Sequence, residues 1–194
     1  MPSDCLDPIP IACEIVQALQ TFVTRQIPAT DPGVLTVAQF HAGTTNNVIP
    51  DTVDLSGTMR ALSDRTRALL IEALPRIAEG IAHAHNAKAQ ITIHGGYPVV
   101  VNDAPFESFA CDVANDLLGE RGVIPLPAPV MGAEDFAYVL ERTPGAMVLL
   151  GVRPKGTTDP APCHSSKMML DEDAMALGAA LHASVATRFL ATEK

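Results

Sequence analysis

The sequence has 194 residues, with 13 Lys and Arg against 22 Asp and Glu, so its formal net charge is −9 with histidine neutral. A chain this acidic is not expected to bind nucleic acid or an anionic membrane surface. Hydrophobic residues make up 47% and charged residues 18% of the chain, which excludes the composition of disordered proteins. The sequence therefore predicts a globular protein of one domain or two small ones.

The four cysteines are widely separated and form no C-x-x-C pair, which predicts neither a zinc ribbon nor a disulfide framework. We therefore expect a reducing, cytoplasmic location. The sequence has no run approaching 18 uncharged apolar residues, and its first residues lack the basic and apolar regions of a secretory signal. No membrane partner is expected.

The first half of the chain shows helix and strand signals in alternation. Asp7 followed by Pro8 is typical of a helix start. Apolar and polar residues alternate over 52–60, as in a strand with one buried face. Pro75 predicts a kink or a break in the second helix. In order, we predict a helix over 8–27, strands over 34–40 and 52–60, a helix that begins after Ser63, and a strand over 88–94.

This element order matches a split βαβ or ferredoxin-like unit that lacks its first strand. That strand is central in such a sheet, so its absence should leave backbone groups unpaired. Gly95–Pro98 marks a boundary, after which we predict helices over 105–118, 133–141 and 171–190 and a strand over 146–152. The fold class is α/β (α+β), with one part over residues 1–96 and a second over 97–194.

Two residues in the first part are candidates for binding an anion. Arg60 lies on the polar face of its strand, and an arginine fork with a nearby asparagine amide such as that of Asn47 can bind a carboxylate. An exposed strand arginine and a turn asparagine explain the same residues, so both interpretations stay open.

Candidates in the second part are Gly132, Glu134 and His164. Glycine before a helix lets a ligand approach the backbone, and Glu134 could then face a cleft, although plain helix capping explains the acid as well. A loop histidine before a helix can ligate a metal, although a surface or capping role is the ordinary alternative. Cys163 is interpreted as structural, and His83 and His85 as favourable charges at a helix C-terminus.

No motif of a serine hydrolase, P-loop or dinucleotide-binding protein is present. Four segments do stand in a distinctive order: Gly43–Asp51 (GTTNNVIPD), Gly57–Arg60 (GTMR), Met131–Phe136 (MGAEDF) and Cys163–Ser166 (CHSS), the last followed by Leu170–Glu172. Together they resemble the M20 metallopeptidase family, specifically its amidohydrolase branch of N-acyl-amino-acid, hippurate and indole-acetyl-amino-acid hydrolases.

The resemblance implies a lid and dimerisation domain over residues 1–96 and the C-terminal part of a zinc-peptidase catalytic domain over 97–194. It implies that His164 binds metal and that Gly132 and Glu134 line the substrate cleft. It also implies that Asn47 and Arg60 hold the substrate carboxylate, often by reaching into the site of the partner subunit of a homodimer.

The family's other metal ligands and its general base, a glutamate, do not occur in this sequence, and one histidine cannot hold a catalytic metal. We therefore expect the chain to be inactive alone. The complete enzyme would use divalent Zn, Mn or Co on N-acyl or N-aroyl amino acids. Three possibilities remain: a portion of an amidohydrolase, a non-catalytic dimerisation or ligand-binding module, and one subunit of a split hydrolase.

Overall fold

The computed structural model describes residues 1–119 and 122–192. The chain forms two compact units: Met1–Val99 together with Pro129–Glu134, and Val100–Ala128 together with the residues from Asp135 onward. Helices and a small antiparallel sheet make up the fold, as the predicted α+β class requires. The assignment of residues 1–96 and 97–194 to lid and catalytic domains stays a prediction.

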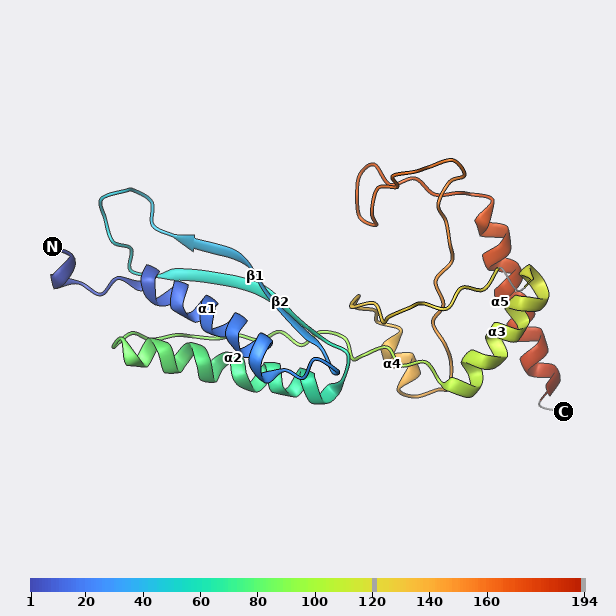
Figure 1. The fold of residues 1–194 in the computed structure, drawn as a ribbon, viewed down its shortest axis with the longest axis horizontal. Coiled ribbons are helices and arrows are strands. Elements are labelled where there is room, and N and C mark those ends of the chain that lie inside the picture. Colours follow the sequence, from blue (N-terminus) through green and yellow to red (C-terminus); the bar gives the residue numbers. More distant parts are fainter. Residues whose placement is uncertain (120–121, 193–194) are drawn as a thin grey trace. The chain divides into compact units, whose positions relative to one another are not determined.

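Two long helices form one layer of the first unit (Figure 1). They are α1 (Pro8–Gln26), capped by the Asp7 carboxylate on the Ile9 N–H at 3.0 Å, and α2 (Asp64–Ala84), capped by the Ser63 hydroxyl. A short 3₁₀ turn over Pro2–Asp4 precedes them. α2 continues through Pro75, so the alternative of a break was wrong. The helix persists because its apolar face is buried against α1 and the sheet.

The sheet is a hairpin of β1 (Gly33–Ala42) and β2 (Val53–Ala61), close to the predicted strands. The register shifts between Val37 and Gln39, which is a bulge in β1. Gly57 lies opposite this bulge, where a Cβ would come within 2.1 Å of the Thr36 carbonyl oxygen. The close approach of the two backbones therefore requires a glycine at this position of the GTMR motif.

The core of the first unit lies between the helices and one face of the hairpin. Leu19 and Leu70 are 2% and 1% exposed and lie at its centre. The inner face of the hairpin adds Leu35 to this core, while the residues that alternate with it are exposed. The opposite face of the hairpin is therefore exposed, and Arg60 belongs to it.

A polar network joins the turn before β1 to the start of α2. The Asp31 carboxylate accepts hydrogen bonds from the Ser63 hydroxyl at 2.7 Å and the Thr66 hydroxyl at 2.9 Å. Thr66 is fully buried. The bonds from Ser63 and Thr66 hold the pKa of Asp31 below its ordinary value.

The segment 87–94 was predicted to contain a strand, and the structure assigns none there. Its residues nevertheless alternate between half-buried and exposed, and Ala87, Ala89 and Ile91 pack against the core. Within the described residues, no backbone hydrogen bond pairs 88–94 with the hairpin. The alternation of half-buried and exposed residues that is typical of a strand is therefore present, but the described residues show no hydrogen bonds that would pair this segment with the sheet.

The second unit contains α3 (Ala104–Leu118), the short α4 (Ala137–Leu140) and α5 (Ala174–Thr192). α3 packs on α5 through the rings of Phe106, Phe109 and Phe189, whose centroids lie 5.7–6.0 Å apart. The predicted helix over 133–141 is reduced to α4, so Glu134 precedes the helix and does not lie in its first turn.

The predicted strand over 146–152 is likewise not assigned. Its first residues are held by a side chain: the Asn102 amide accepts from the Met147 N–H at 2.9 Å and donates to the Met147 carbonyl at 3.2 Å. The Asn102 side chain thus makes the two hydrogen bonds to the Met147 backbone that a neighbouring strand would otherwise make.

α5 is apolar and largely uncovered. Its window Ala174–Ala191 has a mean hydropathy of 1.3 with 6% of it buried, which by length and composition alone is sufficient to cross a membrane. The same test is passed by core helices of soluble proteins, so this is weak support for a span. α5 also carries Arg188, which pairs with Asp116 of α3.

Candidate functional site

Arg60 lies near the end of β2, on the open face of the hairpin and opposite Val34 of β1. Its guanidinium Nη1 donates a hydrogen bond of 2.7 Å to the carbonyl oxygen of Met131. A guanidinium has five N–H donors in a planar fork, so this bond leaves donors for a further acceptor. A carboxylate would accept two of them side by side.

The same bond brings two other predicted residues to Arg60. Met131 belongs to the segment Pro129–Glu134, which packs with the first unit, and that segment contains Gly132 and Glu134. Both are exposed. A Cβ at Gly132 would meet only Val130 Cγ1 at 3.8 Å, so packing within the described chain does not demand a glycine there.

Asn47 lies in the connection between β1 and β2, and its side chain is exposed. Its Oδ1 accepts a hydrogen bond from the Thr45 hydroxyl at 3.2 Å. Both residues line a cavity of about 490 Å³ between this connection and the start of α1, where Asp7 and Ile9 form the opposite wall.

The structure does not bring Asn47 and Arg60 together within one chain. Asn47 lies at the tip of the hairpin, whereas Arg60 is the eighth residue of β2 counted from that tip. At about 3.3 Å per strand residue, the two side chains are roughly 20 Å apart. The expectation that a nearby amide and guanidinium bind one carboxylate therefore does not hold for a single copy.

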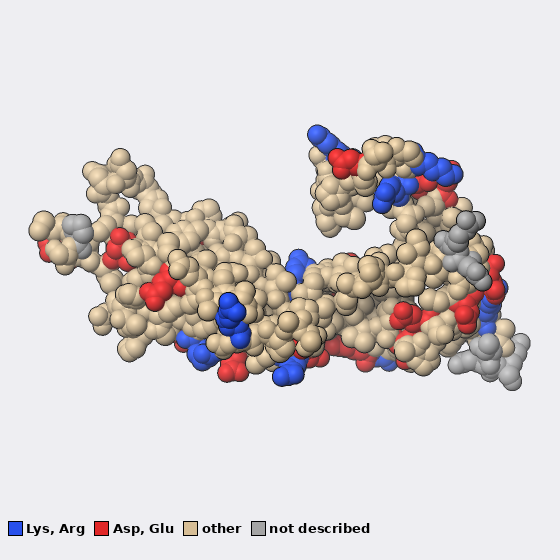
Figure 2. Space-filling view, viewed as in Figure 1, with Lys and Arg blue, Asp and Glu red and all other residues tan. Residues whose placement is uncertain are grey.

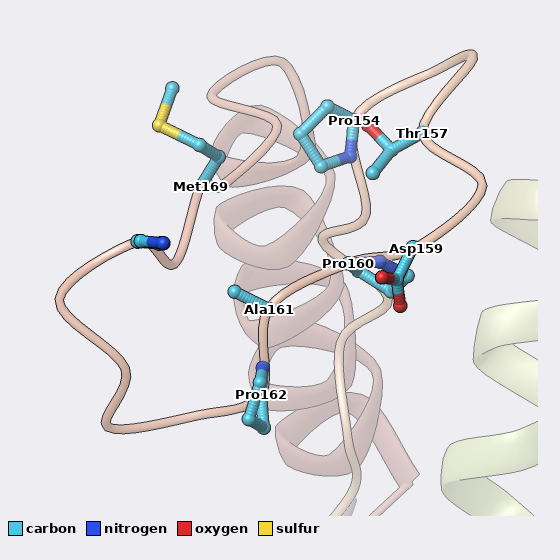
Figure 3. A pocket seen from close by; sticks show the side chains of 8 residues that line it. Pro154, Thr157, Asp159, Pro160, Ala161, Pro162 and Met169 are labelled. Carbon is cyan, nitrogen blue, oxygen red and sulfur yellow. The ribbon is translucent and has the colours of Figure 1, made fainter.

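His164 lies in an exposed turn of the loop 153–170, and its φ of 71° is unusual for a residue other than glycine. The Asp171 N–H donates to the Val152 carbonyl at 2.9 Å and closes the base of this loop. The loop encloses a cavity of about 420 Å³, and Figure 3 shows Ala161 and Pro162 on one side of it, with Met169 on another.

Charged side chains of both signs lie on the surface of the protein. On the face seen in Figure 2, basic and acidic side chains are interspersed among uncharged atoms. The loop 153–170 itself carries Arg153, Lys155 and Lys167 together with Asp159.

The residues present do not form a complete metal centre. No group of three or more His, Cys, Asp or Glu side chains that could hold a metal occurs within residues 1–119 and 122–192. Cys163, next to His164, is an exposed free thiol. The described residues therefore include no complete set of metal ligands around His164.

The remaining histidine predictions concern the end of α2. His85 is the C-cap of this helix, and His83 lies in its last turn, which fits the predicted placement near the helix terminus. His85 Nε2 also lies 2.7 Å from Glu14 Oε2 on α1, a contact that the sequence did not indicate.

Two features of the site were missed by sequence reasoning. The Met131 carbonyl is a backbone group, and nothing in the sequence marks it as the acceptor for an arginine 71 residues away. The contact between Thr45 and Asn47 depends on the turn that brings the two side chains together. The only sign of this contact in the sequence was that Thr45 and Asn47 are two residues apart.

Residues 11–188 match the model of peptidase family M20/M25/M40. The chain is 36% identical to an N-acetyldiaminopimelate deacetylase of Leuconostoc mesenteroides over 89% of its length and 43% of that protein. It is 34% identical to the N-acetylcysteine deacetylase of Bacillus subtilis over 100% of its length and 49% of that protein. The chain thus spans about half the length of the curated relatives it matches.

Among solved structures, a dinuclear metal-binding peptidase of the M20 family from Bacillus subtilis superposes with a TM-score of 0.77 at 29% identity. The superposition covers 98% of this chain and 48% of the other. The helices and antiparallel hairpin described above therefore match an M20 structure.

Proposed function

Because the chain belongs to the M20/M25/M40 peptidase family, we propose that it is part of a metal-dependent amidohydrolase that cleaves the amide bond of N-acyl or N-aroyl amino acids. The observation that carries the proposal is the exposed Arg60 guanidinium, held by the Met131 carbonyl beside Gly132 and Glu134. The two deacetylase relatives, whose names specify N-acetylated amino acids, support the substrate class.

In the proposed enzyme, Arg60 binds the free α-carboxylate of the substrate through the donors that Met131 leaves unused. This contact orients the amide toward the reacting centre and lowers the entropy lost in reaching the transition state. Gly132 and Glu134 line the cleft next to the bound carboxylate. These steps concern binding and orientation only.

Family membership and the dinuclear relative suggest a divalent metal, and we propose Zn, Mn or Co with His164 as one ligand. Since the described side chains do not complete this site, no catalytic step is assigned to the chain itself. We propose that it is inactive alone and that the other ligands and the general base lie on additional polypeptide.

We propose a homodimer as the functional form. One carboxylate can meet both Arg60 and Asn47 only if the two come from different copies, because they lie at opposite ends of one hairpin. The separation of about 20 Å within a chain supports this arrangement. Lid closure over the bound substrate would then exclude water from the cleft.

We further propose that the first unit is a ferredoxin-like lid whose central strand is supplied from outside the described residues. Residues 87–94 show alternating burial and pack against the same core as the hairpin, but no hydrogen bonds among the described residues pair them with it. This arrangement supports the insertion of one further strand between the segment and the hairpin. The proposed location is the cytoplasm, on the basis of the cysteine usage.

The first experiment measures the intact mass of the polypeptide recovered from its source cells. A mass well above 20.4 kDa supports a longer amidohydrolase. A mass of 20.4 kDa leaves the split hydrolase or the non-catalytic module, and co-purification of a partner that restores tight Zn²⁺ binding and activity separates these two.

The second experiment assays the complete, metal-loaded enzyme on N-acetyl and N-benzoyl amino acids. Arg60→Ala should raise KM at least about tenfold, because a charge-assisted contact to the carboxylate is lost. Arg76→Ala, an exposed arginine of α2, is the control and should leave KM unchanged. An unchanged KM in Arg60→Ala would remove Arg60 from the role.

A further inference from the structure

Strand β2 and the segment 88–94 both carry backbone groups that have no hydrogen-bond partner. β2 pairs with β1 along one edge, and no described strand pairs with its other edge. Alternate residues of an antiparallel strand point their N–H and C=O groups to opposite edges, so half of these groups in β2 face away from β1. The backbone groups of 88–94 likewise make no hydrogen bond within the described residues. Both elements therefore offer unused donors and acceptors to a further strand.

The apolar side chains along β2 and the segment 88–94 are only half-buried. Leu55 and Met59 of β2 and Ala89 and Ile91 of the segment all pack against the core of the first unit, and none of them is fully buried. Leu35 of β1 faces the same core and is 7% exposed. Because the less covered side chains belong to β2 and to 88–94, the core lacks a neighbour between these two elements.

The directions of the two elements indicate how a strand would fit between them. β2 and 88–94 run in the same direction, because α2 returns the chain between them, and Figure 1 draws β2 between β1 and the segment. Neighbouring strands lie about 4.8 Å apart, so one inserted strand needs about 10 Å between its two neighbours. A strand that runs opposite to β2 would pair in the antiparallel manner with both, as β1 already does with β2.

We infer that the space between β2 and 88–94 is a binding site for one extended peptide segment, which pairs with both through its backbone. The inference rests on the proposed function, in which the first unit is completed from outside the described residues. The occupant is a strand of the same additional polypeptide that is proposed to hold the remaining metal ligands. The chain spans 43% and 49% of two curated relatives, so each of these relatives has further polypeptide of ample length for such a strand.

The walls of the site specify the sequence pattern of this strand. Alternate side chains of the strand would face the core beside Leu55 and Ile91 and should be apolar, whereas the others would lie on the exposed face with Arg60 and should be polar. Backbone hydrogen bonds supply the affinity in this mode of peptide binding, and the alternating side chains supply the specificity. A slip of one residue would turn the apolar side chains to solvent, so the pattern also fixes the register.

The test places such a strand next to the site. A segment that alternates valine and threonine over the length of β2 is fused ahead of Met1 through a flexible Gly/Ser linker, which gives it a high effective concentration. Hydrogen exchange should slow by about tenfold or more at alternate amides of both β2 and 88–94, because these amides gain acceptors. The matched control is a fusion of the same length with proline at alternate positions, which cannot complete the pairing and should leave exchange unchanged.

Three outcomes would overturn the inference. The first is unchanged exchange at 88–94 in the valine–threonine fusion. The second is slower exchange along β1 alone, which would place the added strand at the outer edge of the hairpin. The third is protection of 88–94 in the unfused chain that rises with protein concentration, which would assign the space to a strand of a second copy. None of these measurements depends on amide hydrolysis, so the KM of Arg60→Ala tests the proposed function separately.

Discussion

Arg60 and Met131 are 71 residues apart in the sequence and are joined by a hydrogen bond of 2.7 Å from the Arg60 guanidinium to the Met131 carbonyl. This bond connects the open face of the hairpin with the segment Pro129–Glu134. A candidate carboxylate-binding residue and two candidate cleft residues are thereby brought together by an interaction with the backbone.

The Arg60 bond should limit the motion of the segment 129–134. Arg60→Met keeps much of the side-chain length and removes the donors, so hydrogen exchange across 129–134 should become faster. Arg76→Met on the exposed side of α2 is the matched control and should leave exchange there unchanged. Equal exchange in the Arg60 variant and the parent protein would show that the segment is held by other contacts.

Gly57→Ala should destabilise the hairpin. The new Cβ would lie 2.1 Å from the Thr36 carbonyl oxygen, so the strands must separate at the bulge. We expect a loss of about 1–3 kcal/mol in the free energy of unfolding, measured by urea denaturation. Gly80→Ala, in an exposed turn of α2 with no atom within 4 Å of the new Cβ, should instead be neutral or stabilising.

Acid should weaken the junction between the 27–33 turn and α2. The hydrogen bonds from Ser63 and Thr66 hold the pKa of Asp31 below its ordinary value of 3.8. The contribution of Asp31 to stability is therefore complete above that pH and is lost as the pH falls through its lower, folded-state pKa.

Asp31→Asn and Thr66→Val should both reduce this acid-dependent part of the unfolding free energy, because one removes the carboxyl and the other removes a donor. Thr66→Ser keeps the hydroxyl and should preserve the dependence. The measurement is the melting temperature as a function of pH between 2 and 5. If the melting temperature of Asp31→Asn fell with decreasing pH just as it does in the parent protein, groups other than Asp31 would cause the loss of stability in acid.

Asn102→Ala should destabilise the second unit by about 1–3 kcal/mol, because the Met147 N–H and carbonyl both lose their partner. Hydrogen exchange at the Met147 amide provides the local readout. Asn115→Ala on α3, whose side chain makes no hydrogen bond among the described residues, is the control. Unchanged protection at Met147 would contradict the role of the Asn102 amide.

The long helices and the hairpin were predictable because their signals are local. Asp7 and Ser63 cap α1 and α2 as expected, and the alternation in 52–60 places Arg60 on the polar face of β2. Each signal lies within a few residues of the element that it specifies. Tertiary contacts did not override them.

The predicted strands over 88–94 and 146–152 failed for a shared reason. A strand is completed by hydrogen bonds to another strand, and alternation in one segment does not supply that partner. Segment 88–94 keeps its alternating burial, and Met147 is bonded to a side chain in place of a neighbouring strand.

The candidate site was only partly predictable. The sequence indicated Arg60 and Asn47 as residues suited to an anion and Gly132 as a position where a ligand can approach the backbone. The separation of 13 positions between Asn47 and Arg60 did not reveal that the two lie at opposite ends of a hairpin. It also could not indicate that Arg60 meets a carbonyl of the segment that contains Gly132.

The closed base of the loop that carries His164 has a practical consequence for engineering. Because Val152 and Asp171 are already joined at 2.9 Å, the ends of the loop are fixed independently of its interior. Doubling the number of residues between fixed ends adds only about 0.6 kcal/mol of closure entropy. Segments of different length can therefore be inserted on either side of His164 while α5 keeps its starting point, which makes the rest of this loop a natural place to diversify a library.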